Sequence, residues 1–255
     1  PLNGNLLIEL DGSDTGSLVD GLVVRDNGDD SVFKGLVVND FANGDAFEIT
    51  ADSIKVQGNY IGVDPTGFSA HPNSVGVNAL AQTPQTGHDA LIGGLSPEDR
   101  NIISGNTAGS AGTAGYPGTG WVIQGNYVGL APDGLTTIPN STLGGSGAFS
   151  IDDCQDVLVG GEDTGATNVI GGNKSHGIAP NNADNVDIVG NFIGLGYDGS
   201  TIIDNTLPDG YYGSGLTFGS DSNVTILKNK IAGWSGGGIY IGSGDDSDFS
   251  ISENE

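Results

Sequence analysis

A thirteen-residue unit occurs three times in this chain. Its copies are KVQGNYIGVDPTG at residues 55–67, VIQGNYVGLAPDG at 122–134 and DIVGNFIGLGYDG at 187–199, so they lie about 66 residues apart. In each copy, apolar residues alternate with other residues on both sides of a Gly-Asn pair. This alternation predicts two short strands that meet at a bend, because Gly and Asn adopt backbone conformations that most other residues avoid. The copies therefore mark a structural unit that the fold uses repeatedly.

Weaker copies of the bend lie between and after the strong ones. They are NIISGNTA at 101–108, NVIGGNKS at 168–175, VTILKNKI at 224–231 and FSISENE at 249–255. If the bends stack on one another, their Asn side chains form one ladder in which each amide donates a hydrogen bond to the next. This alignment predicts a structural ladder of Asn59, Asn106, Asn126, Asn173, Asn191, Asn229 and Asn254.

The spacing of the bends indicates a solenoid. Successive bends are separated by one or two multiples of roughly 19–25 residues, so the long repeat divides into three smaller coils. Coils of this length that contain short strands and no helix are typical of a parallel β-helix, in which stacked coils share one apolar core. We therefore predict an all-β chain of about 11–12 coils, forming a rod on the order of 55 Å long. A sandwich or a propeller is the less favoured alternative.

The repeat also resembles those of a known class of proteins. Units such as VIQGNYVG, followed by a turn of Asp, Pro and Gly and then by IGG and RNIISGN, are similar to repeats of large bacterial right-handed parallel β-helix proteins. The resemblance covers about residues 35–255. It implies a right-handed β-solenoid in an extracellular setting, either secreted or at the cell surface. Most members of the class are adhesin-like or structural stalks.

The repeat predicts a single β-helical domain over residues 1–255. Residues 1–34 fit the repeat less well and are expected to form an irregular first coil or a cap. The sequence lacks Met and ends within a repeat, so we expect it to be a segment of a longer polypeptide. Cys154 is the only cysteine, which excludes an internal disulfide and suggests a small residue of the core or of a turn.

The chain is strongly acidic. It has 7 Lys and Arg residues against 32 Asp and Glu residues, which gives a formal net charge of −25. Because nucleic acids and anionic lipid surfaces bind basic residues, this balance excludes nucleic acid as a partner. No apolar run approaches the ~18–20 residues that a membrane helix needs, so no membrane insertion is expected.

Parallel β-helices also include polysaccharide hydrolases, lyases and uronan epimerases. Polygalacturonase-like members carry an Asp, an Asp-Asp pair, a His-Gly pair and an Arg-x-Lys motif on successive coils. Two carboxylates on adjacent coils would suit an inverting hydrolase. However, the Asp of the first motif belongs to the repeated turn, a Lys replaces the Arg of the last, and the basic residues form no cluster for a lyase. The residues that this alternative would use are Asp133, Asp152, Asp153, His176 and Lys228.

Two further kinds of site are candidates. Asp-rich turns suit Ca²⁺, which takes six to eight oxygen ligands, so Asp245, Asp246 and Asp248 form the predicted metal site, with solvated turn residues as the alternative. No cofactor is required. Exposed aromatic rings can stack on sugars, and Tyr211 and Tyr212 in the loop PDGYYGSG are the candidate glycan-binding residues.

These observations favour a non-enzymatic role. The main prediction is an extracellular structural or adhesive module of a surface protein or filament. Open sheet edges would let copies associate end to end, and glycans or other cell-surface components are further candidate partners. A carbohydrate-active hydrolase or lyase and a glycan-binding module are the alternatives.

Overall fold

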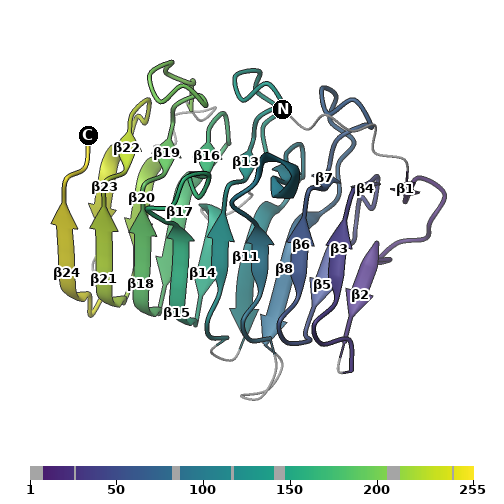
Figure 1. The fold of residues 1–255 in the computed structure, drawn as a ribbon, viewed down its shortest axis with the longest axis horizontal. Coiled ribbons are helices and arrows are strands. Elements are labelled where there is room, and N and C mark those ends of the chain that lie inside the picture. Colours follow the sequence, from purple (N-terminus) through teal and green to yellow (C-terminus); the bar gives the residue numbers. More distant parts are fainter. Residues whose placement is uncertain are drawn as a thin grey trace.

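The chain winds through three parallel β-sheets, which we call A, B and C (Figure 1). The computed structural model describes residues 8–25, 27–81, 87–115, 118–140, 147–205, 213–242 and 244–255. Each turn of the chain, or coil, gives one strand to each sheet in the order A, B, C. This is the predicted all-β parallel β-helix. The described residues contain no α-helix and a single 3-10 turn, η1 (Pro97–Asp99).

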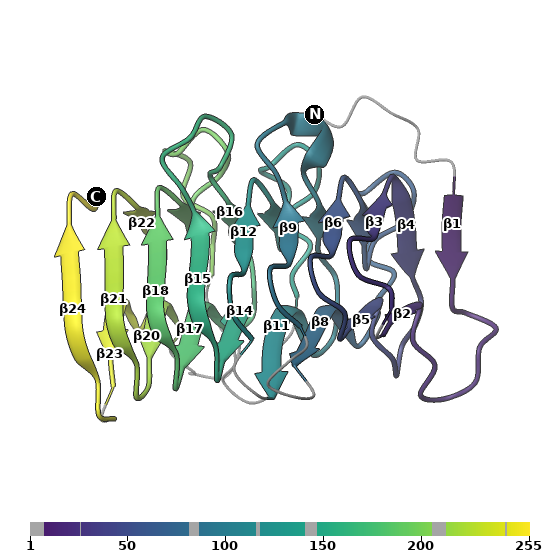
Figure 2. The same ribbon diagram turned by 60° about the horizontal axis from the view of Figure 1, so that its bottom comes forward.

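The strands of each sheet lie side by side along the long axis of the molecule (Figures 1 and 2). Sheet A contains β1 (Ile8–Asp11), β4 (Leu36–Asn39), β7 (Tyr60–Ile61), β10 (Ile102–Ile103), β13 (Tyr127–Val128), β16 (Val169–Ile170), β19 (Phe192–Ile193) and β22 (Lys230–Ile231). Sheet B contains β2 (Leu22–Val24), β5 (Phe47–Ile49), β8 (Val75–Ala81), β11 (Gly109–Gly115), β14 (Gly147–Asp152), β17 (His176–Asn181), β20 (Ser214–Phe218) and β23 (Gly237–Ile241). Sheet C contains β3 (Val32–Lys34), β6 (Lys55–Gln57), β9 (Leu91–Gly93), β12 (Val122–Gln124), β15 (Gln155–Gly160), β18 (Asp184–Val189), β21 (Ser222–Leu227) and β24 (Ser247–Ser252).

The described residues form eight coils, so the predicted count of about 11–12 is wrong. Successive strands of sheet C begin 23 to 38 residues apart, because loops lengthen most coils. The repeat of about 66 residues spans two coils instead of three, since β10 lies between β7 and β13, which belong to the first two strong copies. At ~4.8 Å for each coil, the stack is about 38 Å long instead of about 55 Å.

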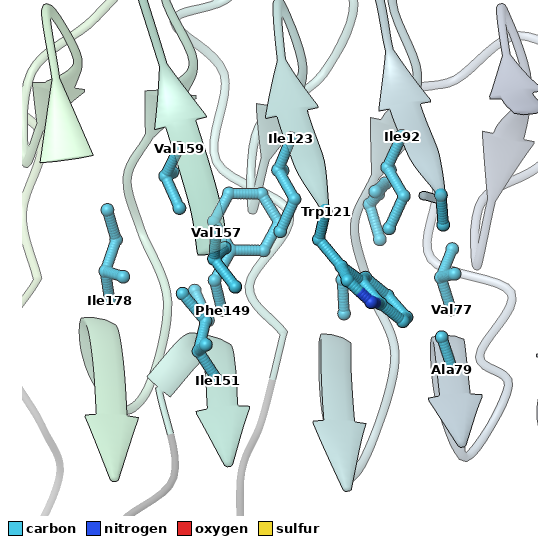
Figure 3. Close-up of a cluster of buried hydrophobic side chains, with 14 of the residues drawn as sticks. Val77, Ala79, Ile92, Trp121, Ile123, Phe149, Ile151, Val157, Val159 and Ile178 are labelled. Atoms are coloured by element: carbon cyan, nitrogen blue, oxygen red, sulfur yellow. The ribbon is translucent and has the colours of Figure 1, made fainter. Parts of the chain in front are cut away.

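Aligned apolar columns fill the space between the three sheets. The parallel register stacks equivalent residues of successive coils on one another, as Figure 3 shows for part of the core. One column of sheet C consists of Val56, Ile92, Ile123, Val159, Ile188 and Ile226. The column that faces it in sheet B includes Phe47, Val77, Ala111, Phe149, Ile178 and Leu216.

Two residues of unusual type also lie in this interior. Trp121 is 1% exposed, and its Nε1 donates to the carbonyl oxygen of Gly87 at 3.0 Å, so the bulky ring has its one polar atom satisfied. Cys154 is buried as well, as the sequence predicted. The core therefore accepts a few large or polar side chains where a backbone partner is at hand.

A continuous asparagine ladder joins the bends between sheets C and A. Nδ2 of each Asn donates to Oδ1 of the next at 2.9–3.2 Å. The backbone N–H of each donating Asn points to the same oxygen, and the remaining Nδ2 hydrogen binds a backbone carbonyl of a neighbouring coil, such as that of Ile92 for Asn126. The members are Asn59, Asn101, Asn126, Asn168, Asn191, Asn229 and Asn254.

The prediction of a single ladder merged two separate ones. Asn106 and Asn173 lie between sheets A and B, in a second ladder with Asn73 and Asn140. The alignment was wrong because it matched the Gly-Asn of IISGN and VIGGN with the strong bends. The strand register instead aligns the Asn that precedes each of these segments, which adds Asn101 and Asn168 to the first ladder.

The Gly of the Gly-Asn motif has a separate role. Gly58 and Gly125 have φ angles of +61° and +72°, a left-handed conformation that turns the chain from sheet C to sheet A. At the same position, Lys228 and Glu253 adopt φ angles of 57° and 55°. The ladder Asn is therefore the residue that these bends share. The residue before it varies, and Gly at that position adopts the left-handed conformation with the least strain.

Removing a middle rung should destabilise the fold strongly. Asn126→Ala removes the acceptor shared by the backbone N–H and one Nδ2 hydrogen of Asn101, and it removes one donor each from Oδ1 of Asn168 and the carbonyl of Ile92. We expect a loss of about 2–4 kcal/mol in the free energy of unfolding, since each unpaired buried group costs about 1–3 kcal/mol. Urea unfolding followed by circular dichroism measures it. Asn254→Ala, at the partly exposed last rung, is the matched control and should cost less than half as much; equal losses would contradict a chain of buried amides.

Candidate functional site

Three hairpin-like loops, which we call arms, project from sheet A. They comprise residues 63–70, 130–137 and 195–202, and each is closed at its base by an antiparallel bridge: Val63 with Ala70, Leu130 with Thr137, and Leu195 with Ile202. The arms follow β7, β13 and β19, so they occur on every second coil. They belong to the loops along the upper edge of Figure 1.

An aspartate holds the tip of each arm in shape. Oδ1 of Asp133 accepts the backbone N–H groups of Leu135 at 2.9 Å and Thr136 at 2.8 Å, and Oδ2 accepts the Thr136 hydroxyl at 2.6 Å. Asp198 binds Ser200 and Thr201 in the same way. These bonds bridge each turn internally, so the tip conformation does not depend on a ligand.

In the first arm, the carboxylate that caps the turn comes from a different position in the sequence. Asp64 occupies the position of Ala131 and Gly196, and it accepts the backbone N–H groups of Phe68 and Ser69. The position that is Asp133 and Asp198 in the other arms is a threonine here. The same turn is therefore stabilised by an acid placed two residues earlier.

The turn hydrogen bonds keep the arm carboxylates ionised. In Asp198, the bonds from Thr201 and Ser200 lower the pKa to about 2. In Asp64 and Asp133, burial works to raise the pKa, but the hydrogen bonds within each turn outweigh it and the pKa is lowered. Every arm thus carries a negative charge throughout the neutral and mildly acidic range.

The bases of the arms rest on a second apolar layer outside sheet A. Its members are Val37, Tyr60, Val63, Ile102, Tyr127, Leu130, Ala131, Ile138, Val169 and Ile203, with Phe192 packed against them. The Arg100 guanidinium lies 4.2 Å from the centre of the Tyr127 ring, a cation–π contact beneath the middle arm. This layer fixes the arms to the solenoid by burial of apolar surface.

Neighbouring arms also touch one another. The backbone N–H of Tyr197 donates to the carbonyl of Gly134 at 3.1 Å. A Cβ atom at Gly134 would lie 2.8 Å from Cβ of Tyr197, and one at Gly67 would lie 2.5 Å from Cγ of Pro132. Glycine is required at these tips because its absent side chain lets successive arms stack in direct contact.

The stacked arms expose four large apolar side chains. Phe68 is 50% exposed, Leu135 38%, Tyr197 53% and Ile202 66%. We call these four residues the arm ridge. Because the arms lie two coils apart, equivalent positions repeat every ~9.6 Å along the axis. Phe68 and Leu135 occupy equivalent positions of the first two arms, and Tyr197 and Ile202 lie at other positions of the third. Exposed apolar side chains on three stacked arms form a surface suited to binding, since single exposed apolar residues are common but groups of them are not.

A histidine directly follows the first arm, where an isoleucine follows each of the other two. His71 takes the place of the buried Ile138 and Ile203 of the other arms, and its Nδ1 lies 2.8 Å from Oδ2 of Asp40. The hydrogen bond to Asp40 raises the pKa of His71 above its usual value. The pair ties the base of the first arm to the end of β4.

The residues predicted for hydrolysis do not converge. In the parallel register, His176 lies beside Gly147 whereas Asp152 lies beside Asn181, which places them about 16 Å apart along the sheet B strands. Asp153 follows at the B–C corner, where it accepts Nδ2 of Asn182 at 2.5 Å, and Asp133 caps an arm beyond sheet A. The structure therefore brings together only the sequence neighbours Asp152 and Asp153.

The other two predicted catalytic side chains have structural partners. Lys228 forms a 2.9 Å ion pair with Glu162, beside a shallow hollow of about 330 Å³ that also includes Asp163 and Thr167. Nδ1 of His176 accepts the backbone N–H of Ser214 at 3.0 Å, and burial lowers the pKa of His176. Both side chains connect coils.

The acids predicted to bind metal are spread along one corner. Asp245 and Asp248 are exposed, while Asp246 accepts the backbone N–H of Asp221 at 2.9 Å. Among the described residues, a different trio brings its carboxylate oxygens within 4.8 Å of one another: Asp20, Asp45 and Glu48. This acidic cluster can hold an ion such as Ca²⁺. The sequence did not indicate it because its members come from two coils.

The local charges of this trio are partly balanced. Burial is the main cause that raises the pKa of Asp45, and the neighbouring Asp20 and Glu48 raise it further. Nδ2 of Asn78 donates to Asp45 at 2.7 Å, and Arg25 pairs with Glu48 at 2.8 Å. The geometry thus moves the candidate cation position from the C-terminal acids to sheet B near the start of the solenoid.

Sequence analysis missed the arm ridge. The predicted glycan-binding residues Tyr211 and Tyr212 lie outside the described residues. Phe68 and Leu135 directly follow the first two strong copies, and Tyr197 lies in the turn of the third, so all three are outside the alternating strands. An apolar residue in or beside each polar turn was the available signal, but exposure could be judged only from the packing. In the part of the chain that the structure describes, no helix is long and apolar enough to span a membrane.

Comparison with known proteins identifies the fold and no sequence family. No family model and no curated protein matches the sequence. The A-module of the mannuronan C-5 epimerase AlgE6 of Azotobacter vinelandii superposes with a TM-score of 0.59 and 13% identity, covering 93% of this chain and 54% of that chain. The A-module of AlgE4 from the same organism gives 0.59 and 16%, covering 91% and 54%. The periplasmic alginate epimerase AlgG gives 0.49 and 13%, covering 91% and 47%.

The chain therefore spans about half the length of these solved structures. At such low identity, the likeness to the two A-modules shows the right-handed parallel β-helix fold alone.

The B–C corner should make stability depend on pH. Burial raises the pKa of Asp221 to about 6, and the charges of Asp246 and Asp152 add to this effect. The folded state thus holds this proton more tightly than the unfolded state, so stability is gained as pH falls from 7 to 5. We expect a gain of about 1 kcal/mol from this group, measured as the urea midpoint at each pH. Asp221→Asn should flatten the profile; an unchanged slope in the variant would refute the assignment.

Proposed function

We propose that this chain is a polysaccharide-binding β-solenoid and that the arm ridge is its binding surface. The observation that carries the proposal is the exposure of Phe68, Leu135, Tyr197 and Ile202 on arms stacked along the axis. Aromatic and aliphatic side chains bind sugars through the apolar faces of the rings, which are removed from water on contact. A row of such groups suits a polymer better than a single sugar.

The rigidity of the arms supports a binding role. Their tips are held by aspartate hydrogen bonds and by contacts between arms, such as that of Tyr197 with Gly134. Surfaces that are already ordered lose little conformational entropy when a ligand binds, which leaves more of the contact energy for affinity. The spacing of ~9.6 Å between arms also repeats along one direction, as the units of an extended polysaccharide do.

The arrangement of acids favours binding over turnover. Asp152, Asp153, His176 and Lys228 do not form a common site, and their polar atoms have partners in the solenoid. The two A-modules that superpose on this chain belong to mannuronan C-5 epimerases. Their resemblance supports a carbohydrate ligand for this chain. A secreted or cell-surface location, with an adhesive role, forms part of the proposal.

A structural role through end-to-end association is a second candidate. It is favoured by the edge strand β24, which has a partner on one side only among the described strands. Ile251 of β24 is 48% exposed, and Ile241 of β23, the edge strand of sheet B, is 42% exposed. Unpaired strand edges with apolar side chains are templates for pairing with another chain. Sedimentation of the protein at rising concentration tests this; a monomer at every concentration contradicts it.

Shortening the ridge side chains should remove polysaccharide binding. Phe68→Ala and Tyr197→Ala together delete the two exposed rings, and each ring is expected to contribute about 1 kcal/mol to binding. We expect about a thirtyfold loss of affinity for any polysaccharide selected on a glycan array, measured by calorimetry. Tyr240→Ala is the matched control, because Tyr240 is 55% exposed on sheet B, away from the arms. An equal loss in the control, or none in the double variant, would place binding elsewhere.

A further inference from the structure

We infer that the polysaccharide bound by the arm ridge carries free amino groups, an inference that rests on the proposed binding function. The arms combine apolar surface with negative charge. Each has a capping aspartate, Asp64, Asp133 or Asp198, and none of residues 63–70, 130–137 and 195–202 is Lys or Arg. A positively charged polysaccharide matches this surface in both respects: its charged groups match the carboxylates, and the apolar faces of its rings match the apolar side chains.

The arm carboxylates remain available as charges although they cap turns. Asp133 and Asp198 are exposed, and their hydrogen bonds come from backbone N–H groups and hydroxyls of their own turn, which leave the negative charge unpaired. No ion pair with a basic side chain is found for them in the described residues. A ligand ammonium group is therefore the missing counter-charge.

Four of the seven basic side chains form ion pairs away from the ridge. Arg25 pairs with Glu48, Lys34 with Asp99, Lys228 with Glu162 and Lys230 with Glu255. Arg100 lies over Tyr127, beneath the middle arm. A polyuronate would thus meet a protein of net charge −25 without a basic partner on the arms. Like charges brought together at a surface oppose binding, and so complementarity excludes the anionic polymer in the absence of a bridging cation.

The geometry fits an amino-sugar polymer in particular. The apolar faces of its rings can lie on Phe68, Leu135 and Tyr197, while its amino groups lie near the carboxylates of the same arms. The arms lie two coils apart, ~9.6 Å, and each of them contributes at least one exposed apolar side chain and one carboxylate. The chemistry that recognises the ligand is therefore stacking combined with ammonium–carboxylate pairing.

The test compares three hexasaccharides of equal length by calorimetry at low ionic strength: β-1,4-linked glucosamine, its fully N-acetylated form and an oligouronate. At a pH below the pKa of the sugar amine, we expect the glucosamine oligomer to bind at least tenfold more tightly than the other two. Added salt should weaken this binding, because surface charge pairs are screened. Equal binding of the acetylated form, or tighter binding of the uronate with chelator present, would overturn the inference.

Matched charge variants separate the ridge from the net charge of the protein. Asp133→Asn with Asp198→Asn removes two ridge charges, while each amide oxygen can still accept the turn N–H groups. We expect roughly fivefold weaker binding of the glucosamine oligomer. Asp245→Asn with Asp248→Asn removes two exposed charges from the B–C corner and β24, and it should change affinity less than twofold. Equal losses in both pairs would show a diffuse charge effect and overturn the inference.

The outcomes distinguish this inference from the function on which it rests. Binding of the acetylated oligomer that is lost in the Phe68→Ala, Tyr197→Ala variant, but unchanged in the Asp133→Asn, Asp198→Asn variant, would overturn the amine requirement and leave the proposed function intact. Binding of none of the sugars would overturn both.

Discussion

The hydrogen-bonded stacking of buried asparagine side chains is the constraint on which the rest of this structure depends. A carboxamide buried at 0–1% exposure, as for Asn101 and Asn126, is tolerated only if its donors and its acceptor find partners. In this fold the partners of each amide lie on the neighbouring coils, through the next Asn and through backbone carbonyls. A coil therefore satisfies its polar groups only as part of the stack, and the stack fixes the register of every strand.

That register leaves the loops outside the core available for a binding surface. Because the interior is completed by aligned apolar columns, the loops that leave the coils are free to vary in length. Three of them carry arms at two-coil intervals, and the apolar layer under the arms covers the outer face of sheet A. The arms rest on two rigid supports, the sheet beneath and the neighbouring arm beside. This packing holds the exposed side chains of the arm ridge in fixed positions.

The acidic composition has a local explanation at many sites. Aspartates cap the arm turns, as at Asp133 and Asp198, or adopt a positive φ at a corner or the start of the next strand, as at Asp153 and Asp156. Asp accepts backbone N–H groups in turns and tolerates positive φ, so a fold with many tight corners uses it often. At most corners the negative charge is a consequence of using Asp to stabilise turns. In the proposed function, the charges on the arms also contribute to ligand binding, because they lie beside exposed apolar side chains.

The sequence alone determined the parallel β-helix and the residues of its core. Alternation around Gly-Asn and its recurrence are local signals, and they located the strands around Asn59, Asn126 and Asn191. The number of coils, the division into two ladders and the arm ridge were decided only by the tertiary structure. Asn106 resembles Asn126 in its local sequence, but which Asn stacks on which depends on strand register between coils. Exposure of Phe68 and Tyr197, and the meeting of Asp20 with Asp45 and Glu48, likewise depend on which coils become neighbours, because residues distant in the chain are brought together only when the coils stack.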